Sequence, residues 1–467
     1  MRRTSLHRVV LSVAVAASLP GSTAAQSHSR DVETGVWALT NARIETVTRG
    51  TIDRGTIVIR NGIIEAVGAN VTPPRDARVM DLAGKTVYPA FIDLTSSMGL
   101  PQQAQQQGRG GGRGGFPFGQ QQDEDEPRVV GLEPARNVAT ELTFPDTAVR
   151  RTRDQGIGAV LVSPPRGLFR GQSALVPMRE DTAARWILKA PVALHVGYQT
   201  IPGQYPGSLL GVIAYQRQAL YDAKRHAMVM DRYKANPRGM ARPAHNAELE
   251  ALVPVVKGEL PVFIAANSEN EILRALALGR EHGVNLHVVG ATEGFRATEA
   301  LKGARMPIVA LDFPTPQQTT GWQYQYATRR DPADSTAARE AATRVIEGNA
   351  AALNTAGIRF ALASGGLAAN TFMENVRKAI AAGLPRNVAL EALTIRAAEV
   401  AGVDAQLGSI EVGKTANLLV VQGEALTESG RLEKVFVDGL QYDVVPAPPG
   451  RGGRGGRANN PPQMREE

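Results

Sequence analysis

The chain has 467 residues, of which 43% are hydrophobic and 21% are charged, and it contains no cysteine. This length and composition predict a globular protein with one large domain or two moderate ones. The lack of cysteine excludes disulfide bonds, thiolate metal sites and cysteine nucleophiles. The formal net charge of +7 includes Arg2, Arg3 and Arg8 at the N-terminus, and the remaining charge is too small to predict nucleic-acid binding.

The N-terminus has the pattern of a secretory signal. Its arginines precede an apolar stretch at 9–19 and the small residues of "GSTAAQS", so we expect a signal peptide over 1–25, cleaved near Ala25. The apolar stretch is much shorter than the roughly 20 residues that span a bilayer, and no later segment is long enough. The sequence therefore predicts an exported protein, periplasmic or extracellular, without a membrane span. Because "RRTSL" also resembles a twin-arginine signal, the export route stays open.

Two segments near the ends of the chain share one sequence pattern. Residues 36–88 and 408–442 are short alternating strands separated by Asn-Gly and Gly turns. We expect a small β-sandwich domain assembled from both ends of the chain, with its first part at 32–88 and its second part at 405–445.

Two low-complexity segments contain arginine-glycine repeats: "GRGGGRGG" at 108–115, which an acidic run follows, and "GRGGRGGR" at 450–457. We expect a disordered insertion at about 101–127 and a disordered tail at 446–467. Such repeats can bind RNA. In an exported protein, however, a flexible loop and tail explain them better, so we expect no nucleic-acid partner.

Between the flanks, short apolar runs alternate with helical patterns. The candidate strands are "VYPAFIDL" at 87, "AVLVSP" at 159, "PVALHV" at 191, "PVFIAAN" at 261, "NLHVVGA" at 285, "PIVALDF" at 307 and "RFALASGG" at 359. A helix is expected at 268–282, behind the N-cap Ser268. This alternation predicts an α/β fold, a (β/α)8 TIM-like barrel over 89–404, with its site at the carboxyl ends of the strands.

Four motifs carry a family resemblance: "NGIIEAVG", "GKTVYPAFID", "ALEALTIRAAEVAGVDAQLGSIEVGKTANLLVV" and "VFVDGL". Over roughly 36–445 the chain resembles the amidohydrolase superfamily and, within it, the imidazolonepropionase-like branch. The resemblance implies a barrel that hydrolyses amide-like C–N bonds, often in rings, with one or two divalent metals at its mouth.

The resemblance also implies a set of metal ligands. They are an H-x-H after strand one, histidines that end strands five and six, and an aspartate that ends strand eight and takes the proton from metal-bound water; this set suits zinc. In this sequence the corresponding positions are Thr95, Ser97, Ala265, Val289 and Gly365. None is a strong ligand, so we expect these to be vestigial metal positions and the protein to hold no metal cofactor.

Three other residues are candidates for a site, although none is assigned a catalytic role. Asp93 is the aspartate that ends the motif "GKTVYPAFID", as in the family, and it either supports the fold or takes part in catalysis. His195 ends a predicted strand at the barrel mouth, where it is either a hydrogen-bonded barrel histidine or a group that titrates near neutral pH. His287 lies two residues before Val289 and shares its face of the strand.

Three functional hypotheses follow. The first is a non-catalytic amidohydrolase-like protein that binds a small molecule, pairs with an active amidohydrolase paralogue or forms a homo-oligomer. The second is a hydrolase of cyclic amide-like, non-peptide C–N bonds that works without the usual metals, through Asp93, His195 and His287. The third is a nucleic-acid or surface-binding role for the arginine-glycine segments. We favour the first, because five ligand positions are lost together.

Overall fold

The computed structural model describes residues 35–101, 132–180, 187–200, 205–313 and 332–444. All of them lie in the compact unit that spans Thr34–Glu467. The predicted signal peptide at 1–25, nearly all of the insertion at about 101–127 and the tail at 446–467 lie outside the described residues. Within the described ranges, no helix has both the length and the apolar character needed to cross a membrane.

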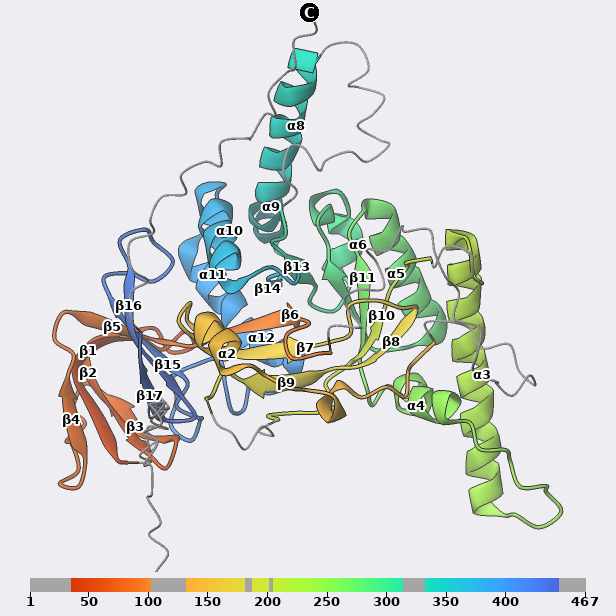
Figure 1. The fold of residues 1–467 in the computed structure, drawn as a ribbon, viewed down its shortest axis with the longest axis horizontal. Coiled ribbons are helices and arrows are strands. Elements are labelled where there is room, and N and C mark those ends of the chain that lie inside the picture. The colour runs from red at the N-terminus through yellow and green to blue at the C-terminus, as the bar shows by residue number, and fades with distance from the viewer. Residues whose placement is uncertain (1–34, 102–131, 181–186, 201–204, 314–331, 445–467) are drawn as a thin grey trace, which may run out of the picture. The chain divides into compact units, whose positions relative to one another are not determined.

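The two ends of the described chain form one eight-stranded sheet (Figure 1), in the order β17-β16-β15-β5-β1-β2-β3, with β4 paired to β1. The strands are β1 (Trp37–Glu45), β2 (Thr51–Arg60), β3 (Ile63–Gly68), β4 (Arg78–Asp81), β5 (Lys85–Pro89), β15 (Leu418–Gln422), β16 (Arg431–Val437) and β17 (Leu440–Asp443). The antiparallel β5–β15 ladder joins the two ends. At the Asn-Gly turn between β2 and β3, Asn61 and Gly62 both have positive φ, which a type I′ hairpin requires.

The central strands form two further sheets. A six-stranded sheet has the order β14-β13-β12-β11-β10-β8, and a three-stranded sheet has the order β6-β7-β9. Their bounds are β6 (Phe91–Ser96), β7 (Ile157–Val162), β8 (Phe169–Gln172), β9 (Ala174–Pro177), β10 (Leu194–Val196), β11 (Val262–Ala266), β12 (Leu286–Gly290), β13 (Ile308–Ala310) and β14 (Ala361–Ala363). The pair β6–β7 and the strands β10 to β14 are parallel, whereas β8 and β9 are antiparallel to their neighbours.

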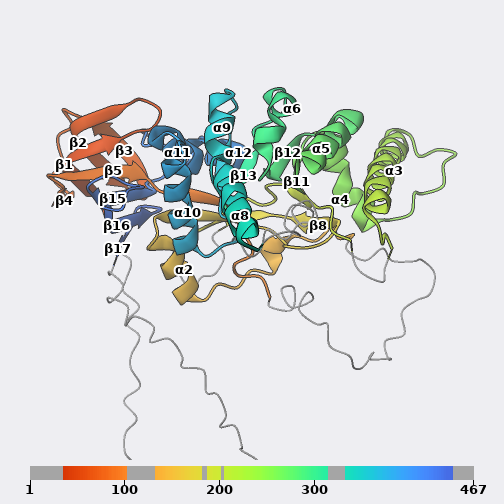
Figure 2. The same cartoon turned by 90° about the horizontal axis from the view of Figure 1, so that it is seen from above.

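Helices cover these strands. They are α2 (Asp146–Arg153), α3 (Leu209–Ala235), α4 (Ala247–Val256), α5 (Glu269–His282), α6 (Thr298–Lys302), α8 (Pro332–Glu347), α9 (Asn349–Thr355), α10 (Ala369–Ala381), α11 (Arg386–Leu393) and α12 (Ile395–Ala401), with 3-10 turns η1 (Val138–Thr140) and η2 (Gly294–Arg296). In Figure 2, α5, α6 and α9 lie along one side of β11, β12 and β13. The predicted helix at 268–282 is confirmed as α5, which begins with a capping box between Ser268 and Glu271.

The two central sheets share one core. Buried side chains of both sheets pack with those of α12: Ile92, Leu94, Leu161, Phe263, Ile308, Ala361, Ala363, Ala397 and Val400. The predicted mixed α/β fold is therefore confirmed. The hydrogen-bonded ladder is not one closed ring, because no ladder joins β8 to β9 or β14 to β6; instead, side-chain hydrogen bonds connect the ends of β6 and β14.

Candidate functional site

Hydrogen bonds join the carboxyl ends of β6 and β14. The N–H groups of Thr95 and Ser364 both donate to Asp93 Oδ1, at 3.1 and 2.9 Å. Ser364 Oγ donates to the Thr95 carbonyl oxygen at 2.8 Å, and the Gly365 N–H donates to Thr95 Oγ1 at 2.7 Å. The structure therefore brings Thr95 and Gly365, two of the predicted vestigial metal positions, into direct contact.

Asp93 is buried, with 5% of its surface exposed. Burial raises the pKa of its carboxyl, while the hydrogen bonds from Ser364 and Thr95 act in the opposite direction. Because its Oδ1 accepts one hydrogen bond from the end of each strand, Asp93 connects β6 to β14. Together with Ser97 and Gly366, it also lines a cavity of about 330 Å³.

Gly365, the position that the family resemblance assigns to the strand-eight aspartate, follows β14 in a conformation that disfavours a side chain. Its φ is +69°, in the left-handed region, and a Cβ at this position would lie 2.7 Å from Asp312 Cβ. An L-residue here would be strained and would also collide with Asp312. The backbone at this position therefore does not accommodate an aspartate without rearrangement.

Asp312, which the sequence analysis did not select, lies two residues after β13. Its carboxyl has no hydrogen bond within the described chain apart from one with its own backbone, and burial raises its pKa to about 6. The sequence offered a signal for Asp312, because Asp312 and Asp93 are each the penultimate residue of a predicted strand, in "PIVALDF" and "VYPAFIDL".

The raised pKa of Asp312 predicts a pH-dependent effect on stability. The folded protein holds the Asp312 proton more tightly than the unfolded chain, so this group stabilises the fold below about pH 4 and loses that contribution as the pH rises toward 6. We therefore expect Asp312→Asn to raise the free energy of unfolding by up to about 3 kcal/mol at pH 7.5, and by much less at pH 4. Urea unfolding of both proteins at pH 4 and pH 7.5 measures this change in the free energy of unfolding.

The matched control for this prediction is Asp53→Asn, because Asp53 is an exposed aspartate on β2. It should change stability by less than about 0.5 kcal/mol at both pH values. An Asp312→Asn effect of equal size at pH 4 and pH 7.5 would contradict a titrating Asp312.

The two candidate histidines lie in one row across three neighbouring parallel strands. His195 pairs with Phe263 in the β10–β11 ladder, and Phe263 pairs with His287 in the β11–β12 ladder. The Phe263 ring separates them, with centroid distances of 5.4 Å to His195 and 5.3 Å to His287. The structure therefore aligns the two imidazoles but does not bring them into contact.

The two histidines differ in their polar contacts. Burial, with a smaller effect from the charge of Arg170, lowers the pKa of His195 to about 3, and its Nε2 has no hydrogen-bond partner among the described residues. His287 Nδ1 donates to the Met306 carbonyl oxygen at 3.0 Å, and burial lowers its pKa. Both rings are therefore neutral near pH 7, which weighs against a histidine that titrates near neutrality.

Ala265 and Val289, two further positions that were predicted to be vestigial, pair with each other in the β11–β12 ladder. Together with Thr95, Ser97 and Gly365 they offer two hydroxyls and no imidazole or carboxylate. Among the described residues, no group of three or more His, Asp or Glu side chains is placed to hold a metal ion. The donors at these positions therefore do not fit a zinc ion, which binds imidazole, carboxylate and thiolate ligands.

A second charged residue at the strand ends is Arg170. Strand β8 runs antiparallel to β10, so Arg170 lies beside Gly197, which directly follows β10. Burial lowers the pKa of Arg170 to about 10, and within the described chain its guanidinium has only a 3.4 Å hydrogen bond, to the Gly167 carbonyl oxygen. This arrangement could bind an anionic group.

Comparisons with known proteins identify the fold. Residues 228–441 match the model of the Amidohydrolase family. An amidohydrolase from Thermotoga maritima MSB8 is 22% identical with a TM-score of 0.69, and the match covers 86% of this chain and 98% of that chain. A prolidase complexed with N-methylphosphonate-L-proline is 16% identical with a TM-score of 0.51, covering 87% and 99%. A comparison with curated proteins gave no match. The described chain therefore has an amidohydrolase fold, and residues 228–441 match the amidohydrolase family.

Proposed function

We propose that this protein is an exported member of the amidohydrolase superfamily that has lost its metal site, and that it binds a small molecule or a protein partner instead of hydrolysing amides. Within the superfamily, the sequence motifs favour the imidazolonepropionase-like branch. We infer that the two central sheets form its (β/α)8 barrel, since they share one core and β14 is connected to β6 through Asp93.

The observation that carries this proposal is the conformation at Gly365. The residue expected to take the proton from a metal-bound water is replaced by a glycine with φ +69°, whose N–H is hydrogen-bonded to Thr95 Oγ1. Because Asp312 fills the adjacent space, a single substitution would not restore the ligand. The loss therefore involves the backbone as well as the side chains.

The charges at the strand ends support a binding role. Arg170 and Asp312 each lack an oppositely charged partner within the described residues. Partly buried charges are costly unless they are paired, so a polar ligand that pairs with one of them would gain binding free energy. An active amidohydrolase relative or a second copy of this chain are the partners that we propose.

A second candidate function is a metal-free hydrolase of cyclic amide-like C–N bonds. The observation in its favour is the pKa of Asp312, about 6, which is close to the value that suits a general base near neutral pH. Asp312 is a better candidate base than His195, whose pKa is lowered to about 3.

Metal content and activity together test the proposal. Elemental analysis of protein purified without chelator should find far less than one zinc per chain, and added zinc should leave the melting temperature unchanged, because the donors for tight binding are missing. Cyclic amides and dipeptides should not be hydrolysed with or without zinc. Stoichiometric zinc together with hydrolysis would overturn the loss of the site.

Asp312→Asn distinguishes the two candidate functions. Metal-independent hydrolysis that Asp312→Asn abolishes and Asp53→Asn preserves would favour the metal-free hydrolase. No turnover in any of the three proteins would favour the binding role.

A further inference from the structure

A large cavity lies on the flank of the barrel strands, next to the cavity at Asp93, with which it shares the lining residues Met98, Thr152, Ala368 and Ala369. It has a volume of about 880 Å³, is open to solvent and is lined by α2, α10, the start of β6, β15 and the loop 424–430 that leads into β16. Cavities of this size are typical of sites for small organic molecules. Neither the family motifs nor the proposed function accounts for it.

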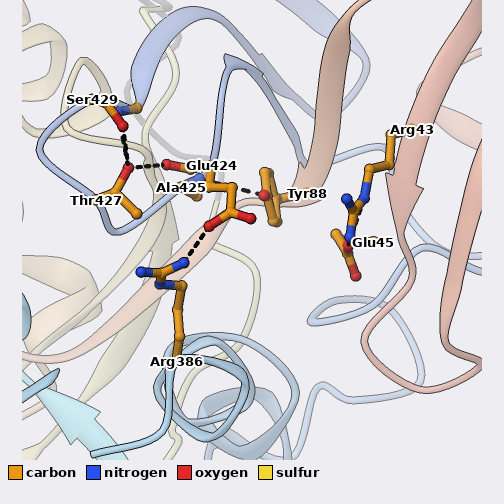
Figure 3. Close-up of polar contacts among 9 residues, drawn as sticks. Arg43, Glu45, Tyr88, Arg386, Glu424, Ala425, Thr427 and Ser429 are labelled. Atoms are coloured by element: carbon orange, nitrogen blue, oxygen red, sulfur yellow. Dashed lines mark hydrogen bonds and ion pairs between the residues drawn. The ribbon is translucent and has the colours of Figure 1, made fainter.

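The loop 424–430 lines one side of this cavity, and Figure 3 shows the polar contacts of this loop. The Ala425 N–H donates to Tyr88 Oη at 3.3 Å, and the Glu424 carboxylate is paired with Arg386 of α11. Thr427 Oγ1 donates to the Glu424 carbonyl oxygen at 2.8 Å and accepts the Gly430 N–H at 3.0 Å. Contacts within the loop and contacts to two other elements therefore hold this side of the cavity in place.

Three arginines line the cavity, each from a different element: Arg151 from α2, Arg377 from α10 and Arg431 from β16. Within the described chain, none of the three forms an ion pair. Two other arginines of α2 differ in this respect, because Arg150 and Arg153 both pair with Glu180, at 3.0 and 2.6 Å. The guanidinium groups at the cavity are therefore available to bind an anion.

The lining also contains a carboxyl group without a partner. Asp154 Oδ1 is buried and accepts no hydrogen bond within the described chain, and burial raises the pKa of this carboxyl in spite of the charges of Arg153 and Arg150. A buried acceptor without a donor is unfavourable. A ligand with an N–H or O–H group could supply the missing hydrogen bond.

Apart from a second carboxylate, that of Glu428, the rest of the lining is mostly apolar: Phe91, Met98, Met373, Leu419, Leu426 and Leu432. An apolar wall next to unpaired guanidinium groups fits a molecule with an apolar body and one acidic group. We propose that this cavity binds a small organic anion with an apolar body, whose acidic group contacts Arg151 and Arg377 and whose neighbouring N–H or O–H donates to Asp154. This inference does not depend on the proposed function.

Two related dyes test the proposal. 8-Anilinonaphthalene-1-sulfonate has an apolar body, an N–H and a sulfonate, whereas N-phenyl-1-naphthylamine has the same apolar body and N–H without the charge. In fluorescence titrations of the full chain, we expect the dye with the sulfonate to bind at one saturable site. Salt should lower its affinity, because salt screens the attraction between the sulfonate and the arginines. The double variant Arg151→Met/Arg377→Met should lose about tenfold or more in affinity for the sulfonate dye and retain its affinity for the neutral dye.

Matched variants locate the site. Arg225→Met/Arg280→Met changes two exposed helix arginines that have no ion pair within the described chain, and it should leave both affinities unchanged. Ala369→Phe places an aromatic ring in the cavity and should lower the affinity for both dyes.

Three results would overturn the proposal. Unchanged sulfonate-dye affinity in Arg151→Met/Arg377→Met would show that these arginines do not bind the charge. Loss of binding of both dyes in that variant would mean that the two arginines maintain the structure of the cavity and do not bind the charge. Unchanged binding of both dyes in Ala369→Phe would place the dye elsewhere.

Discussion

Replacing Gly365 with aspartate, the residue that the family resemblance implies at this position, should destabilise the protein by about 3 kcal/mol or more. The left-handed φ of +69° strains any L-residue, and the new Cβ would lie 2.7 Å from Asp312 Cβ. The substitution also places a second carboxylate beside Asp312, which repels it at neutral pH. Urea unfolding at pH 7 measures the effect.

The chain offers a matched control at the next residue. Gly366 also has a left-handed φ, of +87°, but nothing lies within 4 Å of a Cβ built there. Gly366→Asp should therefore cost only about 1 kcal/mol, from backbone strain alone. Asp312→Gly removes the colliding Cβ. In a double-mutant cycle, adding it to Gly365→Asp should therefore restore more than about 1 kcal/mol of the lost free energy of unfolding. A stable Gly365→Asp protein that binds zinc would contradict our account of the lost site.

Much of the fold followed from sequence patterns with a local physical cause. The strands β10 to β14 were predicted because each is a short apolar run that ends in polar or small residues, and α5 was predicted from the cap that Ser268 and Glu271 form. The shared alternation and turns of the two chain ends predicted that they assemble into one small β-sandwich, and the structure shows the two ends paired in one eight-stranded sheet through β5 and β15.

Strands β8 and β9 were not predicted. They lie in "FRGQSALVP", where Gly171 and Pro177 interrupt any apolar run and each strand has only four residues. Their antiparallel pairing with β10 and β7 is set by tertiary contacts between segments, which no local pattern encodes.

The candidate site was less predictable than the fold. Thr95 and Gly365 were selected through the family resemblance alone, and their hydrogen bond confirms only that the two positions meet. The closeness of Asp312 to Gly365 depends on the pairing of β13 with β14, which a single segment of sequence does not reveal. The lowered pKa of His195 depends on burial against Phe263 in the neighbouring strand, which a single segment of sequence does not reveal.

Asp93→Ala should destabilise the protein by about 3 kcal/mol, because it removes the acceptor of two N–H groups, those of Thr95 and Ser364, at a buried site. Asp93→Asn keeps an oxygen in the same place and should cost less than about 1 kcal/mol. Because burial raises the pKa of Asp93, the neutral amide also avoids the cost of burying a charge at neutral pH. Urea unfolding ranks the two variants.

The exposed Asp81 is the matched control, since its Oδ1 also accepts a backbone N–H, that of Ala83, at 3.1 Å. Asp81→Ala should cost less than about 1 kcal/mol, because water replaces the lost acceptor. Amide hydrogen exchange adds a local test: Asp93→Ala should lose protection at Ser364, and Asp93→Asn should keep it. Equal destabilisation by Asp93→Ala and Asp81→Ala would contradict a connecting role for Asp93. If Asp93→Asn folds normally but loses ligand binding or turnover, Asp93 has a chemical role in addition to its role in connecting β6 and β14.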